Sequence, residues 1–172
     1  RARELVLGKF LATLAFFFLT LVATLTVPVM LNALGQPDNG AILAAYLGTF
    51  LLGAFFLSIG IFFSGFCRDQ IVAFVVTLLV CFAIFLLGTD FVAAQLDSFF
   101  SGFGTFMSNA MGVLIHYTSF TRGVIEVVDV LYFVAWTLLF LILNMMYIEG
   151  RSRPGVKITF GSAVLLCVLI GL

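Results

Sequence analysis

Long stretches without any charged residue alternate with short polar segments along this chain. Residues 10–37, 39–67, 70–89 and 130–148 contain no Asp, Glu, Lys or Arg, and these runs are 28, 29, 20 and 19 residues long. A helix needs about 20 apolar residues to cross the hydrocarbon core of a bilayer. Each run is therefore long enough for one crossing, and the pattern predicts a membrane protein rather than a soluble domain.

The polar segments between the runs set the bounds of the expected helices. We expect membrane-spanning helices at residues 8–31, 41–66, 71–92 and 130–148. A turn is expected at residues 32–40, and a very short hinge at Arg68, Asp69 and Gln70. Backbone groups in lipid must be hydrogen-bonded within their own segment, and the apolar runs are continuous rather than alternating. The expected fold class is therefore all-α, a polytopic transmembrane helical bundle.

The region 93–129 admits two membrane topologies. Residues 98–121 carry no charge and are long enough to cross, yet Gly, Ser, Thr and Asn are frequent in them. Lys and Arg concentrate on the cytoplasmic side of membrane proteins. If residues 98–121 do not cross, seven of the eight Lys and Arg residues face the cytoplasm and only Arg122 lies outside; if they cross, the division is five to three. We therefore expect a re-entrant or interfacial helical segment on the outer face, before the helix at 130–148.

The amino-acid composition limits the kinds of site that this chain is expected to contain. The chain is 63% hydrophobic and 9% charged, whereas soluble domains carry about 25% charged residues. It has one histidine, and its three cysteines show no CxxC spacing, so we expect no metal site and no cofactor. No catalytic motif is visible, which argues against an enzyme. No ionisable residue lies at the middle of an expected span, so any transport should draw its energy from elsewhere. The expected surroundings are a lipid bilayer, with no nucleic acid.

Small and polar residues within the expected spans indicate how the helices meet. Close approach of backbones matters in lipid, because burying apolar surface against a neighbouring helix gains little there. Small residues four positions apart in the second span form the pairs Ala44 and Gly48, Ala54 and Ser58, and Gly60 and Ser64. They predict a helix-packing face, within the subunit or between two subunits. Bonding to neighbouring helices, rather than lining a path for cargo, is expected of the polar residues Thr13, Thr20, Thr24 and Thr26 in the first span and Thr137 and Asn144 in the fourth.

Three segments of the chain resemble one family of membrane proteins. They are residues 1–17 (RARELVLGKFLATLAFF), residues 46–74 (YLGTFLLGAFFLSIGIFFSGFCRDQIVAF) and residues 116–133 (HYTSFTRGVIEVVDVLYF). In their order and spacing they resemble the third membrane helix, the next helix pair with its tight polar hinge, and the outer-face motif of type-2 ABC exporter permeases. The branch is that of gliding motility and nitrous-oxide-reductase maturation. The resemblance covers residues 1–151.

The resemblance implies a role in transport. A permease of this family forms the translocation pathway of an ATP-driven exporter in the bacterial inner membrane. A separate ABC ATPase subunit binds ATP and Mg and hydrolyses the ATP, and two permease copies, identical or paralogous, work with two ATPases. Family members usually have six helices, so residues 1–151 correspond to a permease transmembrane domain whose first two helices precede Arg1. The polar groups are too few and too ordinary to indicate the cargo.

The family pattern also assigns residues to the two faces of the membrane. The candidates for the ATPase-facing side are Arg1, Arg3, Glu4, Arg68 and Asp69. The candidates in the outer-face segment are His116, Tyr117, Phe120, Arg122 and Glu126. An aromatic and basic cluster there could gate the release of cargo. The alternative, which we favour, is that Arg122 pairs with Glu126 four residues on and caps the hairpin.

The end of the chain departs from the family pattern. Residues 152–172 form a linker, broken at Pro154 and Gly155, and the start of a further transmembrane helix near Lys157. Some relatives are fused to an auxiliary subunit whose first helix anchors an extracytoplasmic domain, and we expect such a fusion here. The alternative function is therefore a non-transporting helical membrane anchor or scaffold for an extracytoplasmic auxiliary domain.

Overall fold

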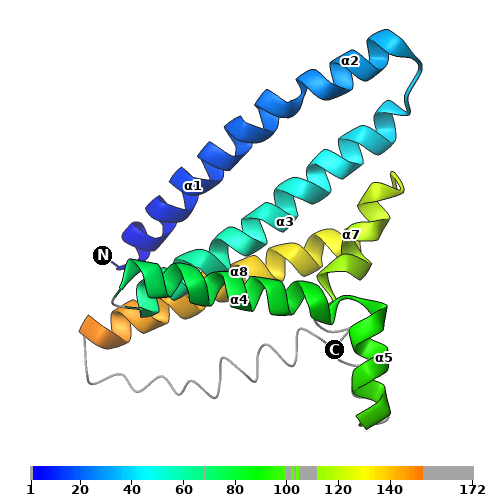
Figure 1. Ribbon diagram of the computed structural model, residues 1–172. Helices are drawn as coiled ribbons and strands as arrows, with labels where there is room; N and C mark the ends of the chain where they lie inside the picture. Colours follow the sequence, from blue (N-terminus) through cyan, green and yellow to red (C-terminus); the bar gives the residue numbers. More distant parts are fainter. Residues whose placement is uncertain (1, 68, 100–101, 103, 105–111, 153–172) are drawn as a thin grey trace.

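The computed structural model describes residues 2–67, 69–99, 102, 104 and 112–152 (Figure 1). In chain order the helices are α1 (Ala2–Thr24), α2 (Thr26–Leu34), α3 (Asn39–Phe66), α4 (Gln70–Leu87), α5 (Asp90–Phe99), α7 (Val113–Thr121) and α8 (Val127–Ser152). No strand occurs in this described part, which confirms the all-α class for it. Four helical stretches are long and apolar enough to cross a membrane: Glu4–Leu34, Asn39–Phe66, Gln70–Leu87 and Val127–Glu149.

The helices α1 and α2 form one long rod with an irregular residue, Leu25, between them (Figure 1). Pro28 has no N–H group to bond the carbonyl of Thr24 four residues earlier. The hydroxyl of Tyr46 on α3 instead donates to that carbonyl oxygen at 3.0 Å. The neighbouring helix thus satisfies the backbone group that the proline leaves free, and the rod continues to Leu34.

The helix α3 is central, because it contacts α1, α4, α7 and α8. It begins at an N-cap, where Oδ1 of Asp38 accepts hydrogen bonds from the backbone N–H of Gly40 at 2.9 Å and of Ala41 at 3.4 Å. At its other end α3 stops at Phe66 and α4 starts at Gln70. The chain therefore reverses within a very short link, as the polar hinge in the sequence predicts.

The main core lies between α3, α7 and α8. Ile59 of α3, Phe120 of α7 and Phe133 of α8 are each 0% exposed. Phe120 fits there because Gly48 on α3 has no side chain: a Cβ at Gly48 would lie 2.6 Å from the Cβ of Phe120. A smaller cluster joins the start of α1 to α3 and α8, and its buried members are Val6, Phe10, Ala54 and Leu141.

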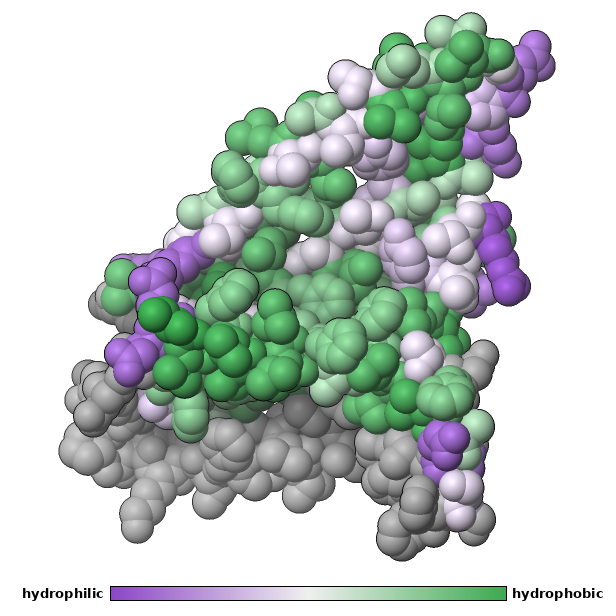
Figure 2. All heavy atoms as spheres, viewed as in Figure 1, coloured by the Kyte–Doolittle hydropathy of each residue, from purple (hydrophilic) through white to green (hydrophobic). Residues whose placement is uncertain are grey.

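Hydrophilic residues gather at the two ends of the bundle, and apolar side chains cover the surface between them (Figure 2). We call one end the Lys9 end; it holds Lys9 of α1 and Asp69 before α4. The other is the Asp38 end; it holds Asp38 before α3, with Arg122 and Glu126 between α7 and α8. An apolar belt between two polar ends is the arrangement expected of helices that cross a bilayer.

The region 93–129 contains no spanning helix among its described residues. The helix α4 ends at Leu87 rather than at the predicted residue 92, because Gly88 and Thr89 form a turn and α5 starts at Asp90. The helices α5 and α7 have 10 and 9 residues. At about 1.5 Å per residue they reach about half of a hydrocarbon core of about 30 Å. Re-entrant placement stays a prediction, and the helix predicted near Lys157 lies outside the described residues.

Candidate functional site

A groove of about 650 Å³ lies between α1, α3 and α4. Its floor is the middle of α3, and its walls are α1 on one side and α4 on the other. The residues that define these three sides include Thr13, Phe17, Gly53, Gly60, Thr77 and Cys81. The groove therefore lies within the apolar belt between the two polar ends.

Small residues on α3 hollow the floor of this groove. A Cβ at Gly53 would lie 2.2 Å from the ring of Phe17, so only glycine lets that ring rest on α3. A Cβ at Gly60 would lie 3.7 Å from the methyl group of Thr77, which is ordinary contact. The absence of side chains at these two positions sets the depth of the groove and lets α1 approach α3 closely.

Three threonine hydroxyl groups that line the groove are bonded to carbonyls of their own helices. Thr13 Oγ1 donates to the carbonyl of Lys9 or Phe10, at 3.0 and 2.9 Å. Thr49 Oγ1 donates to the carbonyl of Ala45 at 2.8 Å, and Thr77 Oγ1 donates to the carbonyl of Ala73 at 2.7 Å. These hydroxyls can therefore offer oxygen acceptors to an occupant, while their hydrogens are engaged. No Asp, Glu, Lys, Arg or His lines the groove among the described residues.

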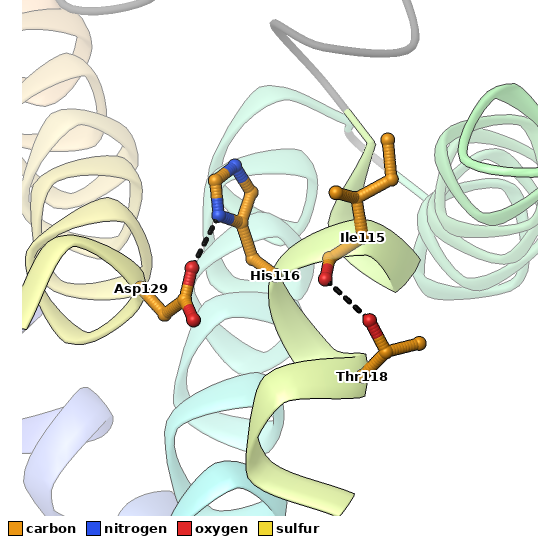
Figure 3. Close-up of polar contacts among 4 residues, drawn as sticks. All are labelled: Ile115, His116, Thr118 and Asp129. Carbon is orange, nitrogen blue, oxygen red and sulfur yellow. Dashed lines mark hydrogen bonds and ion pairs between the residues drawn. The ribbon is translucent and has the colours of Figure 1, made fainter. Parts of the chain in front are cut away.

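A second candidate site is a hydrogen-bonded pair of polar side chains that joins α7 to α8 near the Asp38 end (Figure 3). His116 Nδ1 lies 2.6 Å from Oδ1 of Asp129. The Asp129 side chain is 6% exposed and the His116 side chain is 20% exposed. With Asp129 ionised, its carboxylate can only accept hydrogen bonds, and this contact then requires the hydrogen to be on Nδ1 of His116. The contact is thus a charge-assisted hydrogen bond in a largely buried place.

Local structure explains why Asp129 is tolerated in this place. It lies in the first turn of α8, where the positive end of the helix dipole stabilises a carboxylate. Tyr132 follows three residues later on the same helix face and stacks on the His116 ring, with 4.1 Å between the ring centroids. The second carboxylate oxygen, Oδ2, is buried without a hydrogen-bond partner in the described structure. Asp129 therefore depends on His116 for its side-chain pairing.

Two other residues of the predicted outer-face segment attach α7 to α3. The hydroxyl of Tyr117 lies 3.1 Å from Oγ1 of Thr49, within hydrogen-bonding distance. Phe120 is fully buried over Gly48. The structure thus places Tyr117 and Phe120 on the same short helix as His116, and α7 contacts both α3 and α8.

The expected pair between Arg122 and Glu126 does not form. Both residues are exposed and lie between α7 and α8 rather than on one continuous helix, and no ion pair joins them in the part of the chain described here. The turn is closed by backbone hydrogen bonds instead, from the N–H of Gly123 to the carbonyl of Phe120 at 3.1 Å and from Val124 to Ser119 at 3.1 Å. Gly123 has a φ of +78°, a conformation that favours glycine.

The candidates for the ATPase-facing side fall at the Lys9 end as far as they are described. Arg3 and Glu4 are in the first turn of α1, and Glu4 is exposed. Asp69 is exposed at the N-cap position of α4, but its side chain makes no capping hydrogen bond. Arg1 and Arg68 lie outside the described residues.

The small residues predicted to form a packing face divide into two groups. Ala44, Gly48, Ala54 and Ser58 are buried within this chain. Gly60 is partly exposed and lines the groove, and Ser64 is exposed beside it. The first group thus packs inside the subunit, while the second group faces open space.

Asn144 bonds a neighbouring helix, as the sequence predicts. It is 1% exposed, and its Nδ2 donates to the carbonyl of Ile61 on α3 at 2.9 Å. The oxygen of the same amide, Oδ1, would lie only 2.9 Å from a Cβ at Gly65, so the glycine makes room for the amide. Thr137, also expected to bond a neighbour, donates to Phe133 of its own helix at 2.7 Å.

Asp129 and Tyr132 are site residues that reasoning from the sequence did not single out. A signal was present: Asp129 immediately precedes the charge-free run 130–148, and the chain's one histidine lies 13 residues before it. An acidic residue at the start of an apolar span needs a partner if it is buried. Comparison with protein-family models, curated proteins and solved structures finds no match.

Proposed function

We propose that this chain is a membrane-spanning permease subunit of an ATP-driven exporter in the bacterial inner membrane. It forms part of the translocation pathway and is coupled to a separate ATPase and to a second permease copy. The proposal starts from the resemblance of residues 1–17, 46–74 and 116–133 to type-2 ABC exporter permeases. The four apolar helices and the separation of charged residues into two ends are compatible with it.

The observation that carries the proposal is the groove between α1, α3 and α4. It lies within the apolar belt, its volume of about 650 Å³ suits a small cargo, and its described lining has no carboxylate, imidazole or basic group. Ion-coupled transporters keep ionisable residues within their membrane-spanning segments. An exporter whose path has no such groups has no visible means of ion coupling, so we propose that ATP hydrolysis in a bound subunit supplies its energy.

The Lys9 end is the place where such a partner would bind. Glu4 and Lys9 of α1 and Asp69 before α4 are exposed there. Asp69 is not used as a helix cap, so its carboxylate is available to a basic group on another protein. The link between α3 and α4 is very short, so a partner that displaces Asp69 would move the ends of both α3 and α4, which line the groove.

The test is cross-linking followed by purification of the full-length protein from its own membranes. Cys67, Cys81 and Cys167 are first replaced by serine, because Cys67 is partly exposed only two residues from Asp69. In that background an Asp69→Cys variant should cross-link to a protein with the phosphate-binding GxxxxGK[ST] motif of an ATPase. Gln36→Cys, in the exposed loop between α2 and α3 at the opposite end, is the matched control and should not cross-link to that protein.

Recovery of no ATPase with Asp69→Cys would refute the proposal. Purification of the chain with only an extracytoplasmic domain, together with unchanged export after its deletion, would instead identify a non-transporting anchor. Identical cross-linking from Gln36→Cys would show that the Lys9 end is not the docking face.

A further inference from the structure

A second, smaller cavity lies beside the groove at the Lys9 end. It has a volume of about 160 Å³ and lies where the start of α1 meets the last turns of α3 and α8 (Figure 1). Its polar lining residues are Lys9 of α1, Ser64 of α3 and Asn144 of α8, and the rest of its described lining is glycine or aliphatic. We call this cavity the Lys9 pocket. It has room for about five water molecules at their liquid volume of about 30 Å³ each, and hence for a small polar group.

The buried amide of Asn144 is only half satisfied. Its Nδ2 donates to the carbonyl of Ile61, but its Oδ1 has no hydrogen-bond partner in the described structure, although the residue is only 1% exposed. Buried polar atoms are nearly always paired with protein groups, with water or with a ligand. Because Asn144 lines the Lys9 pocket, an occupant that carries a hydroxyl or N–H group can supply the missing donor.

The same pocket holds donors that no other described residue uses. Ser64 is exposed and its hydroxyl makes no hydrogen bond among the described residues, unlike the threonines of the groove. Lys9 is exposed too, and it forms no ion pair within the described part of the chain. Glu4 and Glu149 are close in sequence to the lining residues but are not among them. An ammonium group next to a hydroxyl favours an anionic occupant such as a phosphate group.

The Lys9 pocket continues into the groove. Ile61 and Ser64 line both cavities, and the groove runs on from them inside the apolar belt. A molecule with an anionic head and an apolar chain therefore fits both cavities at once, whereas a soluble anion leaves the groove empty. Phospholipids have this build, and they surround an apolar belt in a bilayer. Basic pockets between membrane helices are known to bind anionic lipid head groups.

We propose that the Lys9 pocket binds an anionic phospholipid whose head group carries a hydroxyl, as in phosphatidylglycerol. Lys9 and Ser64 donate hydrogen bonds to the phosphate, the head-group hydroxyl donates to Oδ1 of Asn144, and one acyl chain lies in the groove. The lipid contacts α1, α3 and α8 together and holds the start of α1 against the other two helices. The proposal concerns binding alone and does not rest on the proposed export function.

The experiment compares the affinities of four compounds for the purified full-length protein. Native mass spectrometry in detergent counts the molecules bound during titrations with phosphatidylglycerol, phosphatidylmethanol, phosphatidylcholine and glycerol 3-phosphate, the three lipids having identical acyl chains. Phosphatidylmethanol has the same charge as phosphatidylglycerol but no head-group hydroxyl, phosphatidylcholine has no net charge, and glycerol 3-phosphate has no acyl chain. Phosphatidylglycerol should bind about tenfold more tightly than phosphatidylcholine, as for a charged hydrogen bond, and about fivefold more tightly than phosphatidylmethanol, as for a neutral one. Glycerol 3-phosphate should not bind in the same concentration range.

Substitutions of exposed residues test whether the preference for negative charge comes from this pocket. Lys9→Gln should lower the affinity for phosphatidylglycerol by about tenfold, because it removes the positive charge, and Lys9→Arg should lower it by about threefold or less. The matched control is Arg122→Gln, which removes a positive charge from the exposed turn at the opposite end. It should leave the affinity within about twofold. Because Lys9 is exposed, its replacement does not disturb the core.

A second pair of variants tests the acceptor. Asn144→Leu removes Oδ1 and should abolish the preference for phosphatidylglycerol over phosphatidylmethanol, while the preference over phosphatidylcholine stays. Gly65→Ala asks the same question with the amide in place, because its Cβ would lie 2.9 Å from Oδ1 and would block the approach of a head-group hydroxyl. It should give the same loss of preference, and it keeps the test valid if the leucine variant does not fold.

Equal affinities for phosphatidylglycerol and phosphatidylcholine, or equal losses in Lys9→Gln and Arg122→Gln, would overturn the lipid site. Glycerol 3-phosphate that binds as tightly as phosphatidylglycerol would also overturn it and would indicate a site for a soluble anion. A preference over phosphatidylmethanol that survives in the Asn144 and Gly65 variants would show that Asn144 does not recognise the hydroxyl. The purified protein carries no ATPase, so this result does not depend on whether an ATPase cross-links to Asp69→Cys, and the two proposals can fail separately.

Discussion

Two buried polar contacts hold α8, and they differ in construction. In the half of the bundle nearer the Lys9 end, the Asn144 amide donates to the backbone carbonyl of Ile61. In the half nearer the Asp38 end, the Asp129 carboxylate accepts a hydrogen bond from the His116 ring. The first contact joins α8 to a carbonyl inside the 28-residue helix α3, and the second joins it to a helix of nine residues.

The difference concerns both strength and freedom of movement. A hydrogen bond from a neutral amide to a carbonyl of a long helix holds two spans together. Its loss lowers stability only a little, because the amide and the carbonyl are both uncharged. A hydrogen bond between a buried carboxylate and a residue of a short helix is stronger while both partners are present. Removal of one partner is far more unfavourable, because it leaves a buried charge unpaired. The two halves of the molecule therefore differ in what is lost when a contact is broken: a neutral hydrogen bond in one half and the pairing of a buried carboxylate in the other.

The largest expected effect comes from breaking the charged contact. His116→Ala should lower the protection of the α7 backbone amides in hydrogen exchange by about 1.5–3 kcal/mol, because it removes a hydrogen bond to a charged group and leaves the carboxylate buried. The amides of α8 beyond Leu141 should keep their protection. Exchange measured by mass spectrometry on the reconstituted protein resolves the two regions. Equal loss in both would contradict the view that the two halves differ.

The second prediction concerns glycine. Gly48→Ala should cost about 1–3 kcal/mol, since its Cβ would meet the Cβ and Cγ of Phe120, atoms close to the backbone that cannot swing aside. Gly60→Ala should be nearly neutral, because its Cβ would meet a Thr77 methyl at an ordinary 3.7 Å. Unfolding in mixed micelles by a denaturing detergent measures both variants. A Gly48→Ala protein as stable as Gly60→Ala would show that α7 adapts freely to α3.

The helices follow from the sequence, because the length of a charge-free run is a local property. The spans predicted at 41–66 and 130–148 lie within α3 and α8. The prediction that the third span reaches residue 92 is wrong, because α4 ends at Leu87 and the chain turns at Gly88 and Thr89. Gly88, Thr89 and Asp90 interrupt the apolar run in the sequence, and Phe91 and Val92 resume it on the next helix, α5.

The contacts made by α7 follow from the sequence only in part. Spacing of four residues indicated an Arg122–Glu126 pair, but that spacing brings side chains together only on a continuous helix. Gly123 interrupts the helix between them. The same turn folds α7 back along α8 and brings His116 to Asp129, a contact across 13 residues that no helical spacing predicts. The residue types at positions 116–126 indicate that this region carries polar contacts, but which residues pair depends on the geometry of the turn at Gly123.

The third prediction breaks the neutral contact. Asn144→Ala should cost about 0.6 kcal/mol and no more than about 1.7, the range measured for hydrogen bonds between membrane helices. Its Oδ1 is already without a hydrogen-bond partner in the described structure, so its removal adds no penalty. Detergent-induced unfolding measures the change in the free energy of unfolding. Asn144→Leu serves as a control for the cavity that alanine leaves. A loss larger than that of His116→Ala would reverse the order of the two contacts.

The smallest effect is expected where α7 meets α3 through two hydroxyls. Tyr117→Phe removes the hydroxyl that lies 3.1 Å from Thr49 Oγ1, while the ring stays and the Thr49 hydroxyl keeps its bond to Ala45. No buried group loses its only partner, so the loss of α7 amide protection should be about 0.5 kcal/mol or less. The informative combination is Tyr117→Phe with His116→Ala. If the two contacts act independently, the double variant loses the sum of the two single losses in α7 amide protection. A larger loss would mean that the Tyr117–Thr49 and His116–Asp129 contacts are coupled through α7.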